Sequence, residues 1–252
     1  MPKQKGILPI QGTTGNLTFY KTKDGYAVRA KGGVDASRIL NDPKFARTRE
    51  NGREFGRAGN AGKVLRDAMK TVVKRVGDGS LVSRMSRLFN RVIKTDGVNL
   101  RGERKVTEGE LGFFKGFEFN ANSPMSTTLY AAVTGAIDRA SGTATVEIPA
   151  MIPAKFMAVP PGATHYVLTA AAAEVDFADG SSVNAIAATA ELPITEVEAA
   201  PVSLTLNLPA NSDKPLFLAL CIEFLQEVNG RFYGFNAGEF NAMTMLTVNA
   251  AA

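Results

Sequence analysis

The sequence predicts an α+β protein in which a basic N-terminal β-hairpin and arm and an αα-hairpin precede an antiparallel β-sandwich, either immunoglobulin-like or a jelly roll. Apolar residues at helical spacing are confined to the first part of the chain, and short alternating runs between turn residues fill the second. The charge divides at the same place, because residues 1–106 carry 24 Lys/Arg and 9 Asp/Glu whereas residues 107–252 carry 5 and 15. We therefore predict a hairpin at 1–33, a basic arm and αα-hairpin at 34–106, and an acidic β-region at 107–252.

Residues 1–33 are predicted to form small β-structure. A short run from Ile7 is followed by two alternating runs, 17–21 and 26–29, on either side of Lys23-Asp24-Gly25. An Asp-Gly pair between alternating runs is a strong hairpin signal. Because an isolated hairpin is only marginally stable in water, this one must pack against the rest of the chain or against a neighbouring subunit.

The next stretch, 34–62, is basic and rich in glycine. Asp35 and Asp42 are placed as N-caps, and they predict two short helices near 35–41 and 42–51. Each glycine inside a helix costs about 1 kcal/mol relative to alanine, so we expect an irregular arm or a frayed helix after residue 51. The glycines concerned are Gly52, Gly56, Gly59 and Gly62.

Residues 61–94 carry the clearest helical periodicity, in two runs that Gly77-Asp78-Gly79 separates. They predict an αα-hairpin with Ser80 as the N-cap of its second helix. One face of that helix is a basic stripe formed by Arg84, Arg87, Arg91 and Lys94. Such a stripe is either a solvated face or a surface that binds an acidic protein or phosphate.

About eight or nine short strands are expected in the acidic β-region, without helices between them. This pattern is typical of an antiparallel sandwich, although strand order does not follow from the sequence. Asn229-Gly230 predicts a hairpin turn. The candidate strands are 116–119, 128–137, 143–148, 165–177, 183–192, 202–208, 216–228, 231–235 and 243–248.

Residue types that usually carry chemistry are scarce. Cys221 is the one cysteine and His165 the one histidine, so both are interpreted as structural, and neither a disulfide nor a Cys/His metal site is expected. The run 56–64 fails as a phosphate-binding loop because its spacing is wrong and Val64 stands where Ser or Thr is needed. The carboxylate pairs Glu108/Glu110 and Glu196/Glu198 are interpreted as solvated loop charges. We predict no enzymatic activity, no catalytic residues and no cofactor.

The N-terminus lacks the features of a signal peptide, and no apolar run reaches the length of a membrane helix. We therefore expect a cytoplasmic protein without a membrane span. An extracellular or assembly-associated location, reached by a non-standard export route, is left open.

Three stretches, 15–25, 41–56 and 224–230, resemble recurrent stretches of an uncharacterised family of bacterial proteins associated with the Bacteroidetes. The resemblance covers most of the chain, and the second stretch is the most specific. It implies a folded family and brings no activity or functional residues with it.

Two functional hypotheses follow from the charge division. The first is a non-enzymatic structural protein that assembles into a homopolymer, either a filament, a fibre or a ring, through its basic N-terminal region on the acidic β-region of a neighbour. The alternative is an architectural nucleic-acid-binding protein whose basic half contacts phosphates. No small-molecule substrate is identified. The candidate residues for assembly or anion binding are Arg47, Arg49, Arg53, Arg57, Lys63, Arg66, Arg84, Arg87, Arg91 and Lys94.

Overall fold

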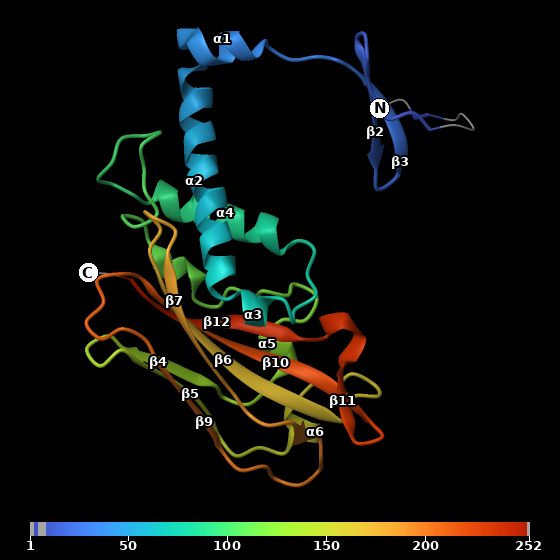
Figure 1. The fold of residues 1–252 in the computed structure, drawn as a ribbon, viewed down its shortest axis with the longest axis vertical. Coiled ribbons are helices and arrows are strands. Elements are labelled where there is room, and N and C mark those ends of the chain that lie inside the picture. The colour runs from blue at the N-terminus through green and yellow to red at the C-terminus, as the bar shows by residue number, and fades with distance from the viewer. Residues whose placement is uncertain (1–2, 5–8, 251–252) are drawn as a thin grey trace. The chain divides into compact units, whose positions relative to one another are not determined.

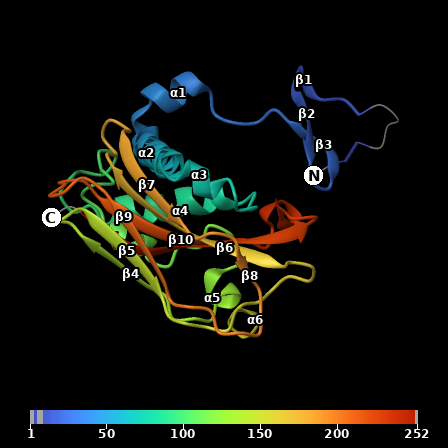
Figure 2. The same ribbon diagram turned by 60° about the horizontal axis from the view of Figure 1, so that its bottom comes forward.

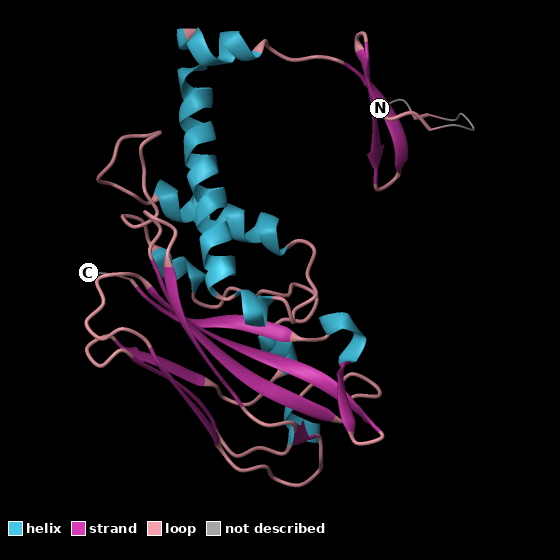
Figure 3. Ribbon diagram, viewed as in Figure 1, coloured by secondary structure: helices cyan, strands magenta, loops and turns pink. Residues whose placement is uncertain are grey.

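The computed structural model describes residues 3–4 and 9–250 of the chain. The chain divides into two compact units, Met1–Arg49 (unit 1) and Glu50–Ala252 (unit 2). Helices and antiparallel sheets both contribute, which confirms the mixed α and β character expected from the sequence (Figure 1; Figure 3). None of the helices in the described residues has the length and hydropathy of a membrane-spanning segment.

Unit 1 contains a three-stranded antiparallel sheet of consecutive strands. β1 (Gly12–Thr14), β2 (Leu17–Thr22) and β3 (Gly25–Ala30) pair in that order, and Thr22 lies opposite Gly25 at the turn. Gly25 has a φ of 113°, a conformation that other residues rarely adopt, so the turn requires glycine at this position. The run predicted from Ile7 begins at residues that lie outside the described ones.

Two short helical elements follow in unit 1, and an aspartate caps each. α1 (Ala36–Asn41) begins after Asp35, whose carboxylate accepts a hydrogen bond of 2.8 Å from a backbone N–H of the first turn. η1 (Pro43–Phe45) begins after Asp42, which accepts a similar bond of 2.9 Å. Each carboxylate satisfies a donor that the helix itself leaves unpaired.

α2 (Ala46–Ala68) is continuous, so the prediction of a helix ending near residue 51 and then an irregular arm or frayed helix is wrong. Local propensity disfavours a helix with four glycines in its interior. Packing outweighs that cost, because one face of the helix is buried in the core of unit 2. The buried apolar side chains on that face are Ala58, Ala61, Val64, Leu65 and Ala68.

α3 (Lys70–Val73) and α4 (Leu81–Lys94) lie on either side of the predicted break. Ser80 occupies the N-cap position of α4, but its hydroxyl does not cap the helix. Instead the Asp78 carboxylate accepts hydrogen bonds from the Ser80 N–H at 2.6 Å and from the Ser80 hydroxyl at 2.7 Å. The buried face of α4 is the one that its spacing predicts, with Leu81, Met85, Phe89, Val92 and Ile93.

The acidic β-region forms two antiparallel sheets. The smaller has the strand order β4 (Thr134–Asp138), β5 (Thr143–Ile148), β9 (Val202–Asn207). The larger has the order β11 (Arg231–Gly234), β10 (Leu216–Val228), β6 (His165–Val175), β7 (Ser182–Ala188), and β12 (Ala242–Asn249) also pairs with β10 and β8 (Leu192–Pro193) with β6. The strand predicted at 116–119 is reduced to one bridge between Glu118 and Thr244. The short helical segments are η2 (Leu111–Phe114), α5 (Met125–Thr128), α6 (Pro153–Phe156) and η3 (Phe235–Gly238).

Strands β6 and β10 are buried on both faces. Their odd-numbered side chains, such as Ala171 and Phe217, pack in one cluster with α2, α4 and η2. Their even-numbered side chains, such as Leu168 and Leu218, pack in a second cluster with the three-stranded sheet. Figure 2 shows α2 and α4 on one side of the six-stranded sheet and β4, β5 and β9 on the other. α2 and α4 therefore share the first cluster with the six-stranded sheet of the acidic β-region.

Cys221 is a buried thiol of the first cluster, as the sequence predicts. Burial raises its pKa to about 12, so it carries no thiolate at neutral pH. His165 is half-buried, and its ring meets Phe232 edge-on at 4.7 Å between ring centres.

The glycines of α2 differ in their surroundings, which provides a matched test. A Cβ at Gly56 would meet nothing within 4 Å, whereas one at Gly62 would lie 3.3 Å from the Arg66 guanidinium and 3.6 Å from Met85 and Phe89. We expect Gly56→Ala to raise the free energy of unfolding by about 0.5–1 kcal/mol, because alanine favours the helix. Gly62→Ala should gain less, since its neighbours must shift. Urea unfolding measures both variants, and equal gains would contradict close packing at Gly62.

Candidate interface on the basic helices

Arg53 and Arg57 on α2 bind the loop 95–106, which follows α4. Arg57 Nη1 donates to the carbonyl oxygens of Gly102 at 2.7 Å and Arg104 at 3.2 Å. Both arginines also form ion pairs with Glu103, at 3.0 Å for Arg53 and 3.1 Å for Arg57. Two of the predicted cations are thus engaged within the chain.

Glu54 brings the same loop close to α2. Its carboxylate is 3% exposed and accepts a hydrogen bond from the Gly102 N–H at 2.8 Å. Gly102 has a φ of 88°, and a Cβ there would lie 2.8 Å from the Cγ of Glu50. Glycine is therefore required for the loop to approach the helix this closely.

Asp96 organises the loop from within, directly after α4. Its buried carboxylate accepts hydrogen bonds from the backbone N–H groups of Val98, Asn99 and Lys105, at 2.8, 3.0 and 2.8 Å, and from the Asn99 side chain at 2.9 Å. Burial opposes ionisation, but these hydrogen bonds outweigh it and lower the pKa of Asp96 to about 2. The loop is thus ordered around a buried negative charge.

The predicted stripe on α4 does not behave as one surface. Arg84 is largely buried, and Arg91 lies over the Phe113 ring at 4.1 Å from its centre. Arg87 and Lys94 are exposed and form no ion pair with any described residue. Arg91, Arg87 and Lys94 are therefore exposed to a partner, whereas Arg84 is not.

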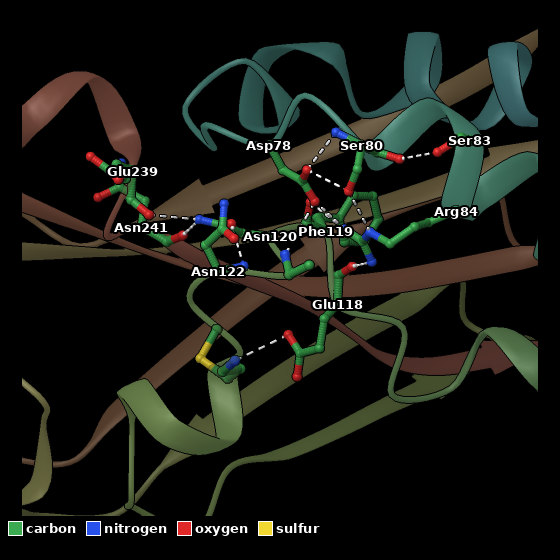
Figure 4. A network of polar contacts seen from close by, with 12 residues as sticks. Asp78, Ser80, Ser83, Arg84, Glu118, Phe119, Asn120, Asn122, Glu239 and Asn241 are labelled. Carbon is green, nitrogen blue, oxygen red and sulfur yellow. Dashed lines mark hydrogen bonds and ion pairs between the residues drawn. The ribbon is translucent and has the colours of Figure 1, made fainter. Parts of the chain in front are cut away.

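Arg84 joins the helices to the acidic β-region (Figure 4). Its guanidinium forms an ion pair with Asp78 and donates to the carbonyl oxygens of Glu118 at 2.6 Å and Phe119 at 3.1 Å. Burial opposes the ionisation of Asp78, yet hydrogen bonds from Ser80 and Arg84 hold its pKa well below the usual range. At Glu118, burial outweighs the hydrogen bonds to the carboxylate and raises its pKa.

The network continues through Asn120, which Figure 4 shows beside Asn241. The Asn120 side-chain amide donates to the carbonyl oxygens of Glu239 and Asn241, both at 2.9 Å. The Asn241 amide donates in turn to the Arg75 carbonyl at 2.7 Å. These bonds connect the turn before α4, the segment 118–122 and the segment 239–241. Arg84 binds two of these three parts, through Asp78 and the carbonyl oxygens of residues 118 and 119, so it stabilises the fold.

The other predicted cations are dispersed. Arg49 donates to two carbonyl oxygens of unit 1, those of Ile39 at 2.7 Å and Asp42 at 3.0 Å. Lys63 forms an ion pair with Asp67 at 2.8 Å, one helical turn along α2. Arg66 is half-buried beside the Met85 sulfur, and Arg47 is exposed.

A groove of about 700 Å³ opens between α2, α4 and the loop 95–106. Sequence reasoning nominated one of its cations, Lys94, but missed Arg101, Arg104 and the exposed Phe55. The charge run Arg101-Gly-Glu-Arg-Lys105 was the available signal, yet nothing local indicated that it lies beside α2. The groove is lined by Asn51, Gly52, Glu54, Phe55, Asn90, Lys94, Arg101 and Arg104.

The two oppositely charged parts of the chain are joined by little ion pairing. Among the described residues, one ion pair links residues 1–106 to the acidic β-region, and it is Arg75 with Glu223 at 3.2 Å. The other pairs of the basic part are made to its own carboxylates, such as Glu54 and Glu103. The positive surface of the helices is therefore not neutralised by the sheets of unit 2.

No group of three or more His, Cys, Asp or Glu side chains in the described part of the chain is placed to bind a metal ion. Comparison of the chain with protein-family models, with curated proteins and with solved structures finds no match. The resemblance to an uncharacterised bacterial family therefore stays a prediction.

Arg84 and Arg87 provide a matched pair on one helix. We expect Arg84→Ala to lower the free energy of unfolding by about 3 kcal/mol, because it leaves the buried Asp78 carboxylate without its cation. Arg87→Ala removes an exposed side chain and should change stability by less than about 0.5 kcal/mol. Guanidinium unfolding measures both, and similar losses would contradict a structural role specific to Arg84.

We expect protonation of Asp96 to contribute to unfolding of the protein in acid. Its pKa is lowered from 3.8 to about 2, so the stability it contributes is present above pH 4 and is lost as the pH falls toward 2. We expect Asp96→Asn to be less stable at pH 7, by about 2 kcal/mol, since it loses hydrogen bonds to a charged acceptor. The difference from the unmodified protein should shrink between pH 4 and pH 2. A difference that stays constant across this interval, measured by thermal unfolding, would contradict the assignment.

Proposed function

We propose that the protein is a non-enzymatic structural subunit that assembles into a homopolymer, in which unit 1 of one subunit packs on the acidic β-region of a neighbour. The observation that carries the proposal is the lack of a core in unit 1. Among its described residues only Ala27 is buried, whereas Ile10, Leu17, Val34 and Leu40 are 43–66% exposed. A segment that orders its backbone without burying apolar side chains lacks the main source of folding free energy.

The sheet of unit 1 has one apolar face. Leu17 and Phe19 alternate along β2, and the register places Phe19 opposite Val28 and Lys21 opposite Tyr26. Because alternate side chains of a strand share a face, Leu17, Phe19, Tyr26 and Val28 lie together. None of these four side chains is buried. A sheet this small needs a further layer over such a face, and a second subunit is the source we propose.

Charge supports the choice of the acidic β-region as that partner. Residues 1–49 carry 10 Lys/Arg against 3 Asp/Glu. Lys21 shares the apolar face and lies over the ring of Tyr26, at 5.8 Å from the ring centre, so a cation accompanies the apolar surface. On the opposite face, Arg29 lies over the ring of Tyr20 at 5.3 Å. The acidic β-region offers exposed carboxylates, including Glu147, Glu191, Asp213 and Glu227. Opposite potentials on two surfaces favour association and set its salt dependence.

We also propose an architecture for the acidic β-region. We interpret its two antiparallel sheets as the β-sandwich expected from the sequence, because residues from both sheets share one hydrophobic cluster. The observed use of Arg53, Arg57 and Arg84 within the chain favours assembly over the nucleic-acid alternative, which needs these guanidinium groups for phosphates.

Assembly can be tested with Leu17→Glu and a matched surface variant, Val82→Glu, on α4. We expect the unmodified protein to elute from a size-exclusion column as multimers at about 50 mM salt, and to shift to smaller species at about 1 M salt, where charges are screened. Leu17→Glu should shift to monomer, because it places a charge on the apolar face of unit 1. Val82→Glu should elute as the unmodified protein does.

Negative-stain microscopy of the same fractions shows whether the multimers are rings or filaments. A monomer at all salt and protein concentrations would overturn the proposal. Retention of DNA or RNA by that monomer in a gel shift at about 50 mM salt would favour the nucleic-acid alternative instead.

A further inference from the structure

The groove on the helices of unit 2 combines positive charge with one exposed aromatic ring. Lys94 is exposed at the end of α4, and Phe55 is 61% exposed on α2. Arg101 contacts the Asn51 side chain at 2.8 Å and Glu50 at 3.6 Å. These cations reach the groove from α4 and the loop 95–106, and Phe55 reaches it from α2.

One buried donor beside the groove lacks an acceptor. The Nε atom of Arg104 is buried and has no hydrogen-bond partner among the described residues, because the nearest carboxylate oxygen, on Glu54, is 4.0 Å away. Glu54 is already bonded to the Gly102 N–H. A carboxylate that entered the groove would meet the positive charges of Arg104, Lys94 and Arg101. The chemistry fits a short acidic segment with an apolar side chain for Phe55.

The chain itself contains such a segment, Glu196-Val197-Glu198, between β8 and β9. Both glutamates are exposed, and Val197 between them is 72% exposed. One cation of its own subunit, Lys155, lies 3.9 Å from Glu196, and this pair is open to solvent. The segment therefore retains most of its charge and its apolar side chain for another surface.

The groove and the segment lie at opposite ends of unit 2. Figure 1 and Figure 2 show the loop that leads into β9 at the end of the sheets near α6, away from α2 and α4. One subunit cannot bring them together within unit 2. Contact between them requires a second copy.

We propose that the groove receives the Glu196-Val197-Glu198 segment of a second copy of this chain. The proposal rests on self-assembly as the function, and it adds a second contact to the one made by unit 1. Because the two surfaces differ and lie at opposite ends of unit 2, the contact is heterologous and propagates from copy to copy. Exposed ion pairs are individually weak, so the contact acts together with that of unit 1 through effective concentration.

Charge reversal tests the pairing directly. The groove variant is Lys94→Glu with Arg101→Glu, and the segment variant is Glu196→Lys with Glu198→Lys. We expect each alone to raise the dissociation constant of assembly at low salt at least 10-fold, measured by sedimentation velocity. An equimolar mixture of the two should recover at least half of the unmodified assembly, because the reversed charges match again. Lys115→Glu, at an exposed site elsewhere on unit 2, is the control and should have no effect.

A crosslink that does not depend on charge keeps the test valid if a reversal variant fails to fold. A mixture of Phe55→Cys and Val197→Cys chains should form a disulfide-linked dimer under mild oxidation, whereas Lys115→Cys with Val197→Cys should not. Cys221 is buried and does not compete.

The outcomes separate the two proposals. Assembly of both reversal variants at the unmodified dissociation constant, or the lack of a Phe55–Val197 crosslink in assembled protein, overturns this contact and leaves self-assembly through unit 1 standing. Loss of assembly in both variants without recovery on mixing also overturns the pairing. A monomeric unmodified protein overturns self-assembly itself.

Discussion

The burial of β6 and β10 on both faces is the constraint on which unit 2 depends. A strand with apolar side chains on one face only can leave its other face in water. β6 and β10 cannot, because both of their faces are apolar: on β6, for example, Ala171 lies in one cluster and Leu168 in the other. One face must be covered by helices and the other by a second sheet. This requirement places α2 and α4 on one side and β4, β5 and β9 on the other, and it keeps α2 helical through its glycines.

The same arrangement decides which cations remain available. The apolar sides of α2 and α4 face the sheet, so their basic sides face outward or toward the loop 95–106. Carboxylates of the same part of the chain then bind some of the guanidinium groups. Asp78 binds Arg84, while Glu54 and Glu103 draw the loop onto α2 beside Arg57. What is left is a groove with an excess of positive charge and a buried donor without a partner.

Unit 1 differs from unit 2 because its elements do not enclose a hydrophobic core. Its strands pair through backbone hydrogen bonds and aspartates cap its short helices, but one buried alanine does not make a core. Local structure of this kind persists when another surface covers it. Unit 1 and the groove both carry an excess of positive charge, whereas the acidic β-region carries the opposite charge with few cations of its own. We propose that assembly between copies brings the positive charge of unit 1 and of the groove against the negative charge of the acidic β-region, and covers the apolar face of unit 1.

The sequence by itself determined the elements whose signals are local: the strands of alternating or continuous apolar runs, the Asp24-Gly25 turn, the aspartate caps and the apolar face of α4. Only the tertiary structure decided the rest. It extended α2 past residue 51, because burial against the sheet outweighs the local cost of glycine. It bound Arg57 to carbonyl oxygens 45 and 47 residues away and Arg84 to segments 34 and 35 residues away, and it brought Arg101 and Arg104 beside Phe55. Such partners are set by packing between distant segments, and no local pattern specifies them.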